Sequence, residues 1–134
     1  MKKNLFFATL GLAVALFTIS CSKSDTTPPA NTTPEGKWVG FITYIVGPSR
    51  YFAVTFKSGS VILVEANSDT APDIANGTWS LVGDNVRATY TYVGGTAETF
   101  SIAGKYSTSS KLMDGTIGPG SSTTGTGTFS VTKQ

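Results

Sequence analysis

The part of the chain from residue 36 to residue 134 alternates between two kinds of short segment. Runs rich in Val, Ile, Thr, Phe, Tyr and Trp are separated by clusters of Gly, Ser, Pro, Asn and Asp, a pattern that predicts strands joined by turns. Eight runs fit this description, at residues 37–46, 50–57, 60–66, 77–82, 85–92, 98–106, 111–117 and 126–133. No stretch among them has the periodicity of an amphipathic helix. The sequence therefore predicts an all-β domain.

Four of the runs alternate apolar and polar residues with a period of two, as expected of a strand with one buried face. Their apolar members are Phe52, Val54 and Phe56; Trp79 and Leu81; Val86, Ala88, Tyr90 and Tyr92; and Phe129 and Val131. A sheet with one buried and one solvated face is typical of antiparallel pairing.

Short connections between the runs predict hairpins between neighbours in sequence. Ser58-Gly59, Gly83-Asp84 and Gly94-Gly95 supply the positive φ angles of tight turns, whereas residues 67–76 and 118–125 form longer connections. A meander of eight strands has an exposed edge at each end, and closure into a barrel removes both edges. We therefore predict an eight-stranded antiparallel up-and-down barrel over residues 36–134. A two-sheet sandwich is the alternative.

The first twenty residues differ in kind from this domain. Lys2 and Lys3 precede an apolar run at residues 5–19, and the small Ser20 precedes the single cysteine, Cys21. A basic head, an apolar run and a small residue at the cleavage point predict a secretory signal peptide at residues 1–20. The run is shorter than the roughly 20 apolar residues that a transmembrane helix needs.

The string Thr18-Ile19-Ser20-Cys21 resembles the lipobox of bacterial lipoproteins, although Leu is more usual at the position of Thr18. The resemblance implies that Cys21 is acylated and that the chain is cleaved before it. Two or three acyl chains would give a stable membrane anchor. Ser22, rather than Asp, follows the cysteine, which resembles lipoproteins sorted to the bacterial outer membrane. Whether the domain faces the periplasm or the cell surface is left open.

Residues 21–35 follow as a segment of Ser, Thr, Pro, Asn and charged residues. Because it has almost no apolar side chains to bury, we expect it to form a disordered tether between the anchor and the domain.

The start of the predicted domain, Gly36-Lys37-Trp38, resembles the Gly-x-Trp motif of lipocalins and related calycins. Gly127-Thr128-Phe129 near the end of the chain resembles the closing strand of small lipocalin-like domains on bacterial lipoproteins. The resemblance covers residues 36–134 and implies a barrel with Trp38 packed across one closed end. Avidin-like barrels also begin with Gly-x-Trp. Unlike full-length lipocalins, the chain has no predicted C-terminal helix and no cysteine pair.

Charge and residue content argue against several classes of function. The chain has 10 basic and 8 acidic residues, and loss of Lys2 and Lys3 with the signal would leave 8 of each, so no basic stripe for nucleic acid is expected. There is no histidine, and the only cysteine belongs to the lipobox. This excludes Ser-His-Asp and Cys-His catalysis and the usual zinc sites. We expect no enzyme activity, no cofactor and no metal.

Aromatic residues are the candidates for a ligand pocket or a packed core. The set comprises Trp38, Phe52, Phe56, Trp79, Tyr90, Tyr92, Phe100 and Phe129. An eight-stranded barrel is just wide enough for its own side chains or for one small ligand. The leading hypothesis is a lipid-anchored binding module for a small apolar molecule. The alternatives are a filled barrel whose loops contact an envelope or host protein, and an inhibitor-type module that inserts a loop into a partner enzyme.

Overall fold

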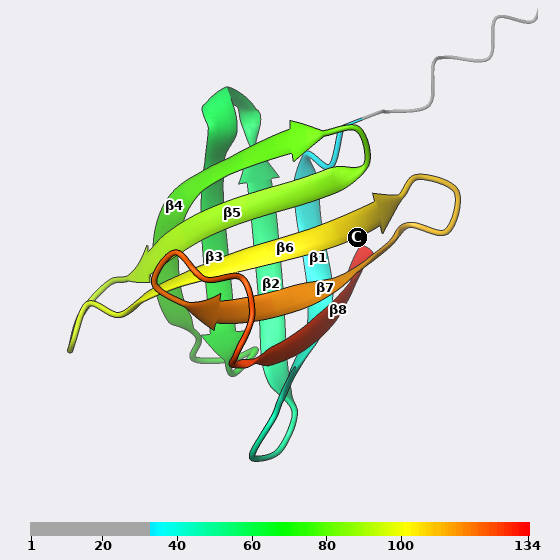
Figure 1. Ribbon diagram of the computed structural model, residues 1–134. Coiled ribbons are helices and arrows are strands. Elements are labelled where there is room, and N and C mark those ends of the chain that lie inside the picture. The colour runs from blue at the N-terminus through cyan, green and yellow to red at the C-terminus, as the bar shows by residue number, and fades with distance from the viewer. Residues whose placement is uncertain (1–32) are drawn as a thin grey trace, which may run out of the picture.

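The computed structural model describes residues 33–134, which form one closed barrel of antiparallel strands (Figure 1). The strands are β1 (Gly36–Tyr44), β2 (Arg50–Lys57), β3 (Val61–Asn67), β4 (Asp73–Val82), β5 (Asn85–Tyr92), β6 (Thr99–Ser107), β7 (Leu112–Pro119) and β8 (Gly127–Lys133). Each strand pairs with its neighbours in sequence, and β1 pairs with β8 to close the barrel. The predicted up-and-down barrel is confirmed, and the sandwich alternative is wrong. The predictions for the signal peptide, Cys21 and the start of the tether lie outside the described residues.

Helix is almost absent from the described part of the chain. One 3-10 turn, η1 (Ser58–Ser60), joins β2 to β3, and Gly59 within it has a φ of 73°. Within residues 33–134 no helix is long and apolar enough to cross a membrane.

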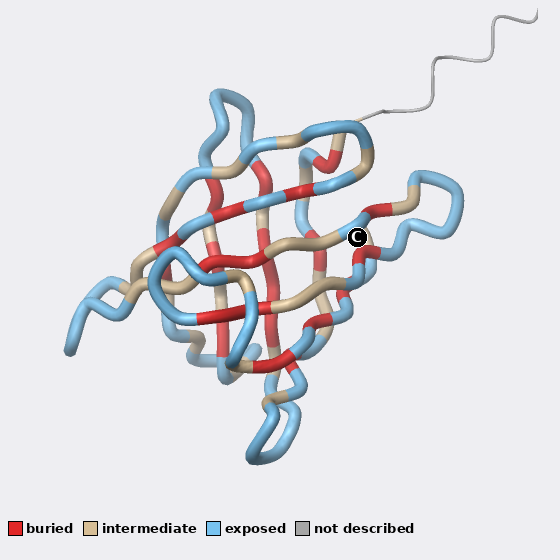
Figure 2. Tube along the Cα trace, in the orientation of Figure 1, coloured by how far each residue is buried: buried red, intermediate tan, exposed pale blue. Residues whose placement is uncertain are grey.

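The core is the interior of the barrel, and alternate residues of every strand point into it. In Figure 2 the buried residues form short, interrupted stretches along the strands. Phe52, Val54 and Phe56 of β2 are buried, as the period-two pattern predicts. Ile62 and Val64 of β3 pair with Phe56 and Val54 and lie on the same inner face of the sheet. The interior is therefore largely filled by side chains.

Two glycines make room for the largest side chain of β8. Gly104 of β6 pairs with Gly115 of β7, and the ring of Phe129 lies over both. A Cβ at Gly104 would approach that ring to 2.8 Å, and a Cβ at Gly115 would approach it to 2.6 Å. An aromatic ring covering paired glycines is a known way to stabilise a strongly curved sheet.

Trp38 packs across the end of the barrel at which β1 begins. Its Nε1 donates a hydrogen bond of 2.6 Å to the carbonyl oxygen of Pro34. Its ring meets that of Tyr106 edge-on at 6.3 Å, and the ammonium of Lys133 lies 5.6 Å from the ring centroid. We refer to this as the Trp38 end.

The fourth strand differs from the prediction. We expected a loop over residues 67–76, but β3 continues to Asn67 and β4 begins at Asp73. Ala75 pairs with Val64 and is completely buried, so burial of this inward-facing position extends the ladder. Asn76 is a turn former by composition, but here it sits on the outer face, where an amide side chain can remain solvated. Only residues 68–72 form the connection.

The long connection after β7 folds back onto the outside of the barrel. The Ser101 hydroxyl on β6 donates a 2.7 Å hydrogen bond to the carbonyl oxygen of Gly120 and lies 2.8 Å from the Thr89 hydroxyl. These two contacts explain why Ser101, a polar residue on the outer face of the barrel, is buried.

Candidate functional site

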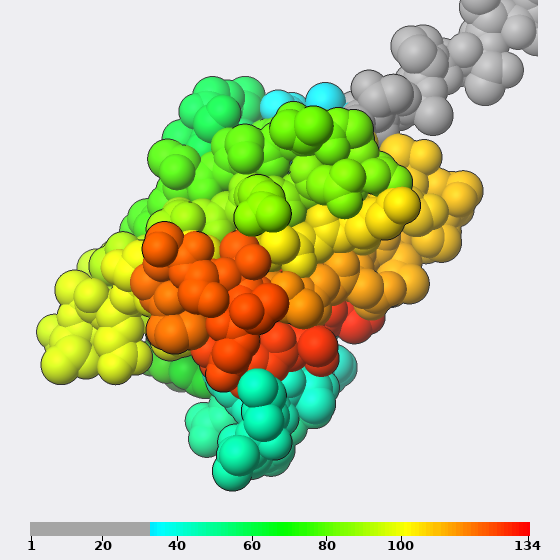
Figure 3. All heavy atoms as spheres, in the orientation of Figure 1, coloured from blue at the N-terminus to red at the C-terminus, as the bar shows by residue number. Residues whose placement is uncertain are grey.

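The end of the barrel opposite Trp38 contains an open cavity, which we call the mouth. Four connections meet there, at residues 45–49, 68–72, 93–98 and 120–126. The cavity has a volume of about 480 Å³, within the range of small-molecule sites. Figure 3 shows the connections after β5 and after β7 as separate protrusions of the surface at this end.

Aromatic rings from adjacent strands line the floor of the mouth. Tyr92 of β5 and Phe100 of β6 meet edge-on, with ring centroids 6.0 Å apart and planes at 81°. Tyr44, the last residue of β1, and Ile117 of β7 form other parts of the wall. Each of these positions continues the inward-facing set of its strand, so the barrel register itself brings them together.

Tyr90 lies directly beneath this floor. Its ring packs against Tyr92 at 5.9 Å and against Phe100 at 6.3 Å, and the residue is 1% exposed. Burial raises the pKa of its hydroxyl well above the ordinary value, and the nearby hydroxyls of Tyr92 and Tyr44 raise it further. Within residues 33–134 the Tyr90 hydroxyl is the one buried side-chain polar atom without a hydrogen bond of standard geometry, although the Tyr92 hydroxyl lies close enough to interact with it. Native proteins rarely leave such a group unsatisfied.

Two carboxylates stand on the rim of the mouth. Asp73 opens β4, and its Oδ2 accepts a 2.5 Å hydrogen bond from Nδ2 of Asn67, the residue that ends β3. Asn67 has a φ of 71°, a left-handed conformation that Asn tolerates better than most residues. Glu98 precedes β6, and its carbonyl accepts a 3.0 Å bond from the Tyr92 amide. The rim is thus held by one hydrogen bond between side chains, at Asp73, and by one backbone hydrogen bond, at Glu98.

The two carboxylates of the rim affect the pKa of Tyr92. Burial raises the pKa of Tyr92 from 10.0 to about 12, and the neighbouring Tyr44 is the next contributor. Asp73 and Glu98 raise this pKa too, because their negative charges oppose formation of a tyrosinate. The mouth therefore has an electronegative character.

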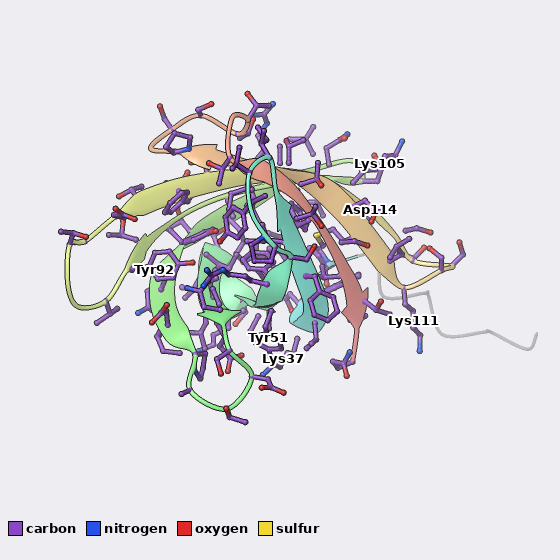
Figure 4. All side chains as sticks on the ribbon, turned by 90° about the horizontal axis from the view of Figure 1, so that it is seen from below. Lys37, Tyr51, Tyr92, Lys105, Lys111 and Asp114 are labelled. Carbon is purple, nitrogen blue, oxygen red and sulfur yellow. The ribbon has the colours of Figure 1, made fainter. Side chains whose placement is uncertain are left out.

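The basic side chains of the described barrel do not line the cavity, although Arg50 opens β2 at the same end. None of the residues that line the mouth is a lysine or an arginine. Lys133 lies over Trp38, and Lys105 pairs with Asp84 at 3.2 Å in the turn after β4. In Figure 4, Tyr92 lies on one side of the barrel and Lys105, Lys111 and Asp114 lie on the other.

The eight aromatic candidates from the sequence all point into the barrel, but they divide between core and mouth. Trp38, Phe52, Phe56, Tyr90 and Phe129 are buried, and Trp79, Tyr92 and Phe100 are partly buried against them. Of the eight, Tyr92 and Phe100 line the mouth. Trp79 lies towards the Trp38 end, where its Nε1 donates a 2.9 Å hydrogen bond to the carbonyl oxygen of Lys57.

Sequence reasoning missed several residues of the mouth. The sequence predicts no binding role for Tyr44, Glu98 or Asp73. Strand register brings all three to one rim, and a single sequence does not reveal register across eight strands. Ile45 and Val46 were expected to continue the first strand, but they lie in the connection after β1 and are 71% and 90% exposed.

Other sites on the described residues are less suited to a ligand. A larger hollow of about 790 Å³ lies near the Trp38 end, between the connection after β4 and the connection after β6, and two of the charged residues that line it, Lys105 and Asp84, pair at 3.2 Å and neutralise each other. The acidic side chains of residues 33–134 do not gather into a group of three that could hold a metal ion.

Comparison of the chain with protein-family models, curated proteins and solved structures gives no match.

Proposed function

We propose that this protein is a non-catalytic binding module of the bacterial envelope and that its binding site is the mouth of the barrel. The observation that carries the proposal is the cavity of about 480 Å³ floored by Tyr92 and Phe100. Small-molecule sites usually combine apolar or aromatic walls with a few convergent polar groups, and the mouth has both, since Asn67, Asp73 and Glu98 line it beside the rings. The mouth fits a small molecule with an apolar or aromatic body that packs against these rings.

The location of the cavity also limits the size of the ligand. Below the floor, the barrel interior is occupied by residues such as Tyr90, Phe52 and Phe129. A ligand would enter the upper layer of the barrel and would not thread along its axis. The proposed binding site is therefore shallow and suits a compact molecule, whereas a long acyl chain would need a deeper pocket.

In this proposal the module is held at the outer membrane by acylated Cys21, with residues 21–35 as the tether. The described chain enters the barrel at the Trp38 end, and the mouth lies at the opposite end. Cys21→Ser should move the protein from the membrane fraction to the soluble fraction of cells and abolish incorporation of labelled fatty acid. Unchanged membrane association of this variant would refute the anchor.

Binding is tested by screening small aromatic and aliphatic molecules against the isotope-labelled protein and mapping amide shifts in NMR spectra. We expect hits to shift residues 92–98. Thr96→Trp, in a connection that lines the mouth, should block these hits. The matched control is Thr108→Trp, an exposed threonine in the hairpin connection at the Trp38 end, which should bind as the wild type does. Hits that are equally weakened by both variants would refute the mouth as the site.

A second candidate function, contact with a protein partner, is favoured by one specific observation. Phe41, Ile45 and Val46 are all strongly exposed near the connection between β1 and β2. Large apolar side chains grouped on a protruding hairpin are typical of protein contacts. Ile45→Asp with Val46→Asp should then abolish cross-linking to an envelope protein in cells without changing the melting temperature. Undiminished cross-linking would exclude this hairpin.

A further inference from the structure

We infer that the ligand of the mouth is an organic cation, namely a primary amine or quaternary ammonium attached to a small apolar group. The inference rests on the proposed function and adds the charge of the ligand to it. It is carried by three features that converge on one cavity: uncompensated carboxylates, perpendicular aromatic faces and a buried hydroxyl without a partner.

The two carboxylates at the rim provide the negative charge that a cationic ligand would pair with. Asp73 and Glu98 come from β4 and from the residue before β6, on either side of Tyr92 in β5. Asn67 holds one oxygen of Asp73 at 2.5 Å and leaves the other oxygen available to a ligand. No basic side chain lines the cavity among the described residues, so neither carboxylate is neutralised there. An ammonium group would complete two charge-assisted hydrogen bonds that the protein itself leaves open.

The aromatic rings supply a second source of selectivity for cations. Tyr92 and Phe100 meet with their planes at 81°, so they present two π faces at nearly a right angle. The face of an aromatic ring is negative, and a cation within about 6 Å of its centroid is attracted to it. Tyr44 adds a third ring to the wall of the cavity. Aromatic walls of this type with acidic groups at the rim are suited to alkylammonium groups.

The Tyr90 hydroxyl supplies the third feature. It is buried and unpaired, and it lies close to the hydroxyls of Tyr92 and Tyr44, both of which line the cavity. A hydroxyl oxygen can accept a hydrogen bond from an ammonium N–H. Tyr90 does not itself line the cavity, so an ammonium group would satisfy its hydroxyl only by entering between the adjoining hydroxyls of Tyr92 and Tyr44.

Ligands of other charge fit these features less well. A carboxylate or phosphate would face Asp73 and Glu98 in the cavity, and none of the described residues that line it is basic and could offset the repulsion. A neutral apolar molecule would pack on the rings but would have to desolvate the carboxylates without pairing them. The carboxylates and the aromatic rings together therefore favour a cationic ligand over an anionic or a neutral one.

The experiment compares three ligands of similar size on the full-length protein: benzylamine, benzyl alcohol and phenylacetate. Amide shifts of residues 92–98 in NMR titrations report occupancy of the mouth. We expect benzylamine to bind at least about tenfold more tightly than benzyl alcohol, and phenylacetate to bind more weakly still. Asp73→Asn and Glu98→Gln should each weaken benzylamine by about tenfold and leave benzyl alcohol unchanged.

Two further variants test the net charge of the protein and the buried hydroxyl separately. Asp114→Asn removes one negative charge on β7 towards the Trp38 end and should leave benzylamine affinity unchanged. Tyr90→Phe keeps the ring and should weaken benzylamine several-fold. Equal weakening by Asp114→Asn and by Asp73→Asn would overturn the inference, since it would indicate attraction to net charge alone.

The outcomes distinguish this inference from the function on which it rests. If benzyl alcohol or phenylacetate binds at the mouth as tightly as benzylamine, the inference of a cationic ligand is overturned, but the proposed binding function is still supported. If none of the three ligands shifts the amide signals of residues 92–98 at millimolar concentration, while neutral or anionic screening hits do, the inference of a cationic ligand is again overturned. If neither these ligands nor any screening hit acts there, both proposals fail.

Discussion

Tyr90→Phe should stabilise the free protein while it weakens ligand binding. The substitution removes only the hydroxyl, which is buried without a hydrogen-bond partner. The ring contacts at 5.9 Å with Tyr92 and at 6.3 Å with Phe100 are retained. An unsatisfied buried polar group costs about 1–3 kcal/mol, so we expect a gain of about 1–2 kcal/mol in the free energy of unfolding.

Urea denaturation followed by circular dichroism measures this change. The midpoint should rise while the slope stays constant, because the surface exposed on unfolding does not change. In a thermal scan the melting temperature should also rise, by roughly 4–8 °C for each kcal/mol gained in a domain of about 100 residues. The control is Tyr51→Phe on the outer face of β2, which we expect to change stability by less than about 0.5 kcal/mol.

A loss of 1 kcal/mol or more in Tyr90→Phe would refute this reasoning. It would mean that the hydroxyl makes a hydrogen bond in the free protein, and that a ligand is not needed to satisfy it. Stabilisation together with weaker binding would instead show that the hydroxyl is retained at a cost to stability, as is common at functional sites.

Three further predictions concern the barrel itself. Gly115→Ala should destabilise the protein by about 2–3 kcal/mol in urea denaturation, because its Cβ would overlap the carbonyl oxygen of Ala103; an unchanged midpoint would contradict the close approach. Trp38→Ala should cost about 3–5 kcal/mol, since a buried indole and its hydrogen bond are lost; a cost below 1 kcal/mol would show that the Trp38 end is not packed as described. Stability should fall as pH rises from 10 to about 12, because the folded-state pKa of Tyr92 is raised and the unfolded chain ionises first; constant stability across this window would contradict burial of Tyr92.

The sequence predicts the architecture well because each strand carries local information about its own faces. The alternation of Phe52, Val54 and Phe56 requires one buried face, and the short turn at Gly83-Asp84 requires antiparallel neighbours. The error at residues 73–76 has a clear physical cause. Local turn propensity of Asp73 and Asn76 was outweighed by pairing with β3 and by burial of Ala75, which are tertiary effects.

The mouth could be predicted only in part. Tyr92 and Phe100 are recognisable as inward-facing aromatics, but nothing local indicates that they sit at the open layer while Phe52 is in the filled one. Glu98 and Asp73 are far apart in sequence from Tyr44, and only the register of the closed barrel brings them to one rim. The exposure of Ile45 and Val46 depends on where β1 ends, and strand ends are poorly specified by pattern alone.

The central claim, that the mouth is a small-molecule site, is tested most directly by a crystal structure of the protein with its best screening hit bound. We predict electron density for the ligand between Tyr44, Tyr92 and Phe100, with a polar group of the ligand near Asp73 or Glu98. Density for the ligand elsewhere on the barrel, with only solvent in the mouth, would contradict the claim.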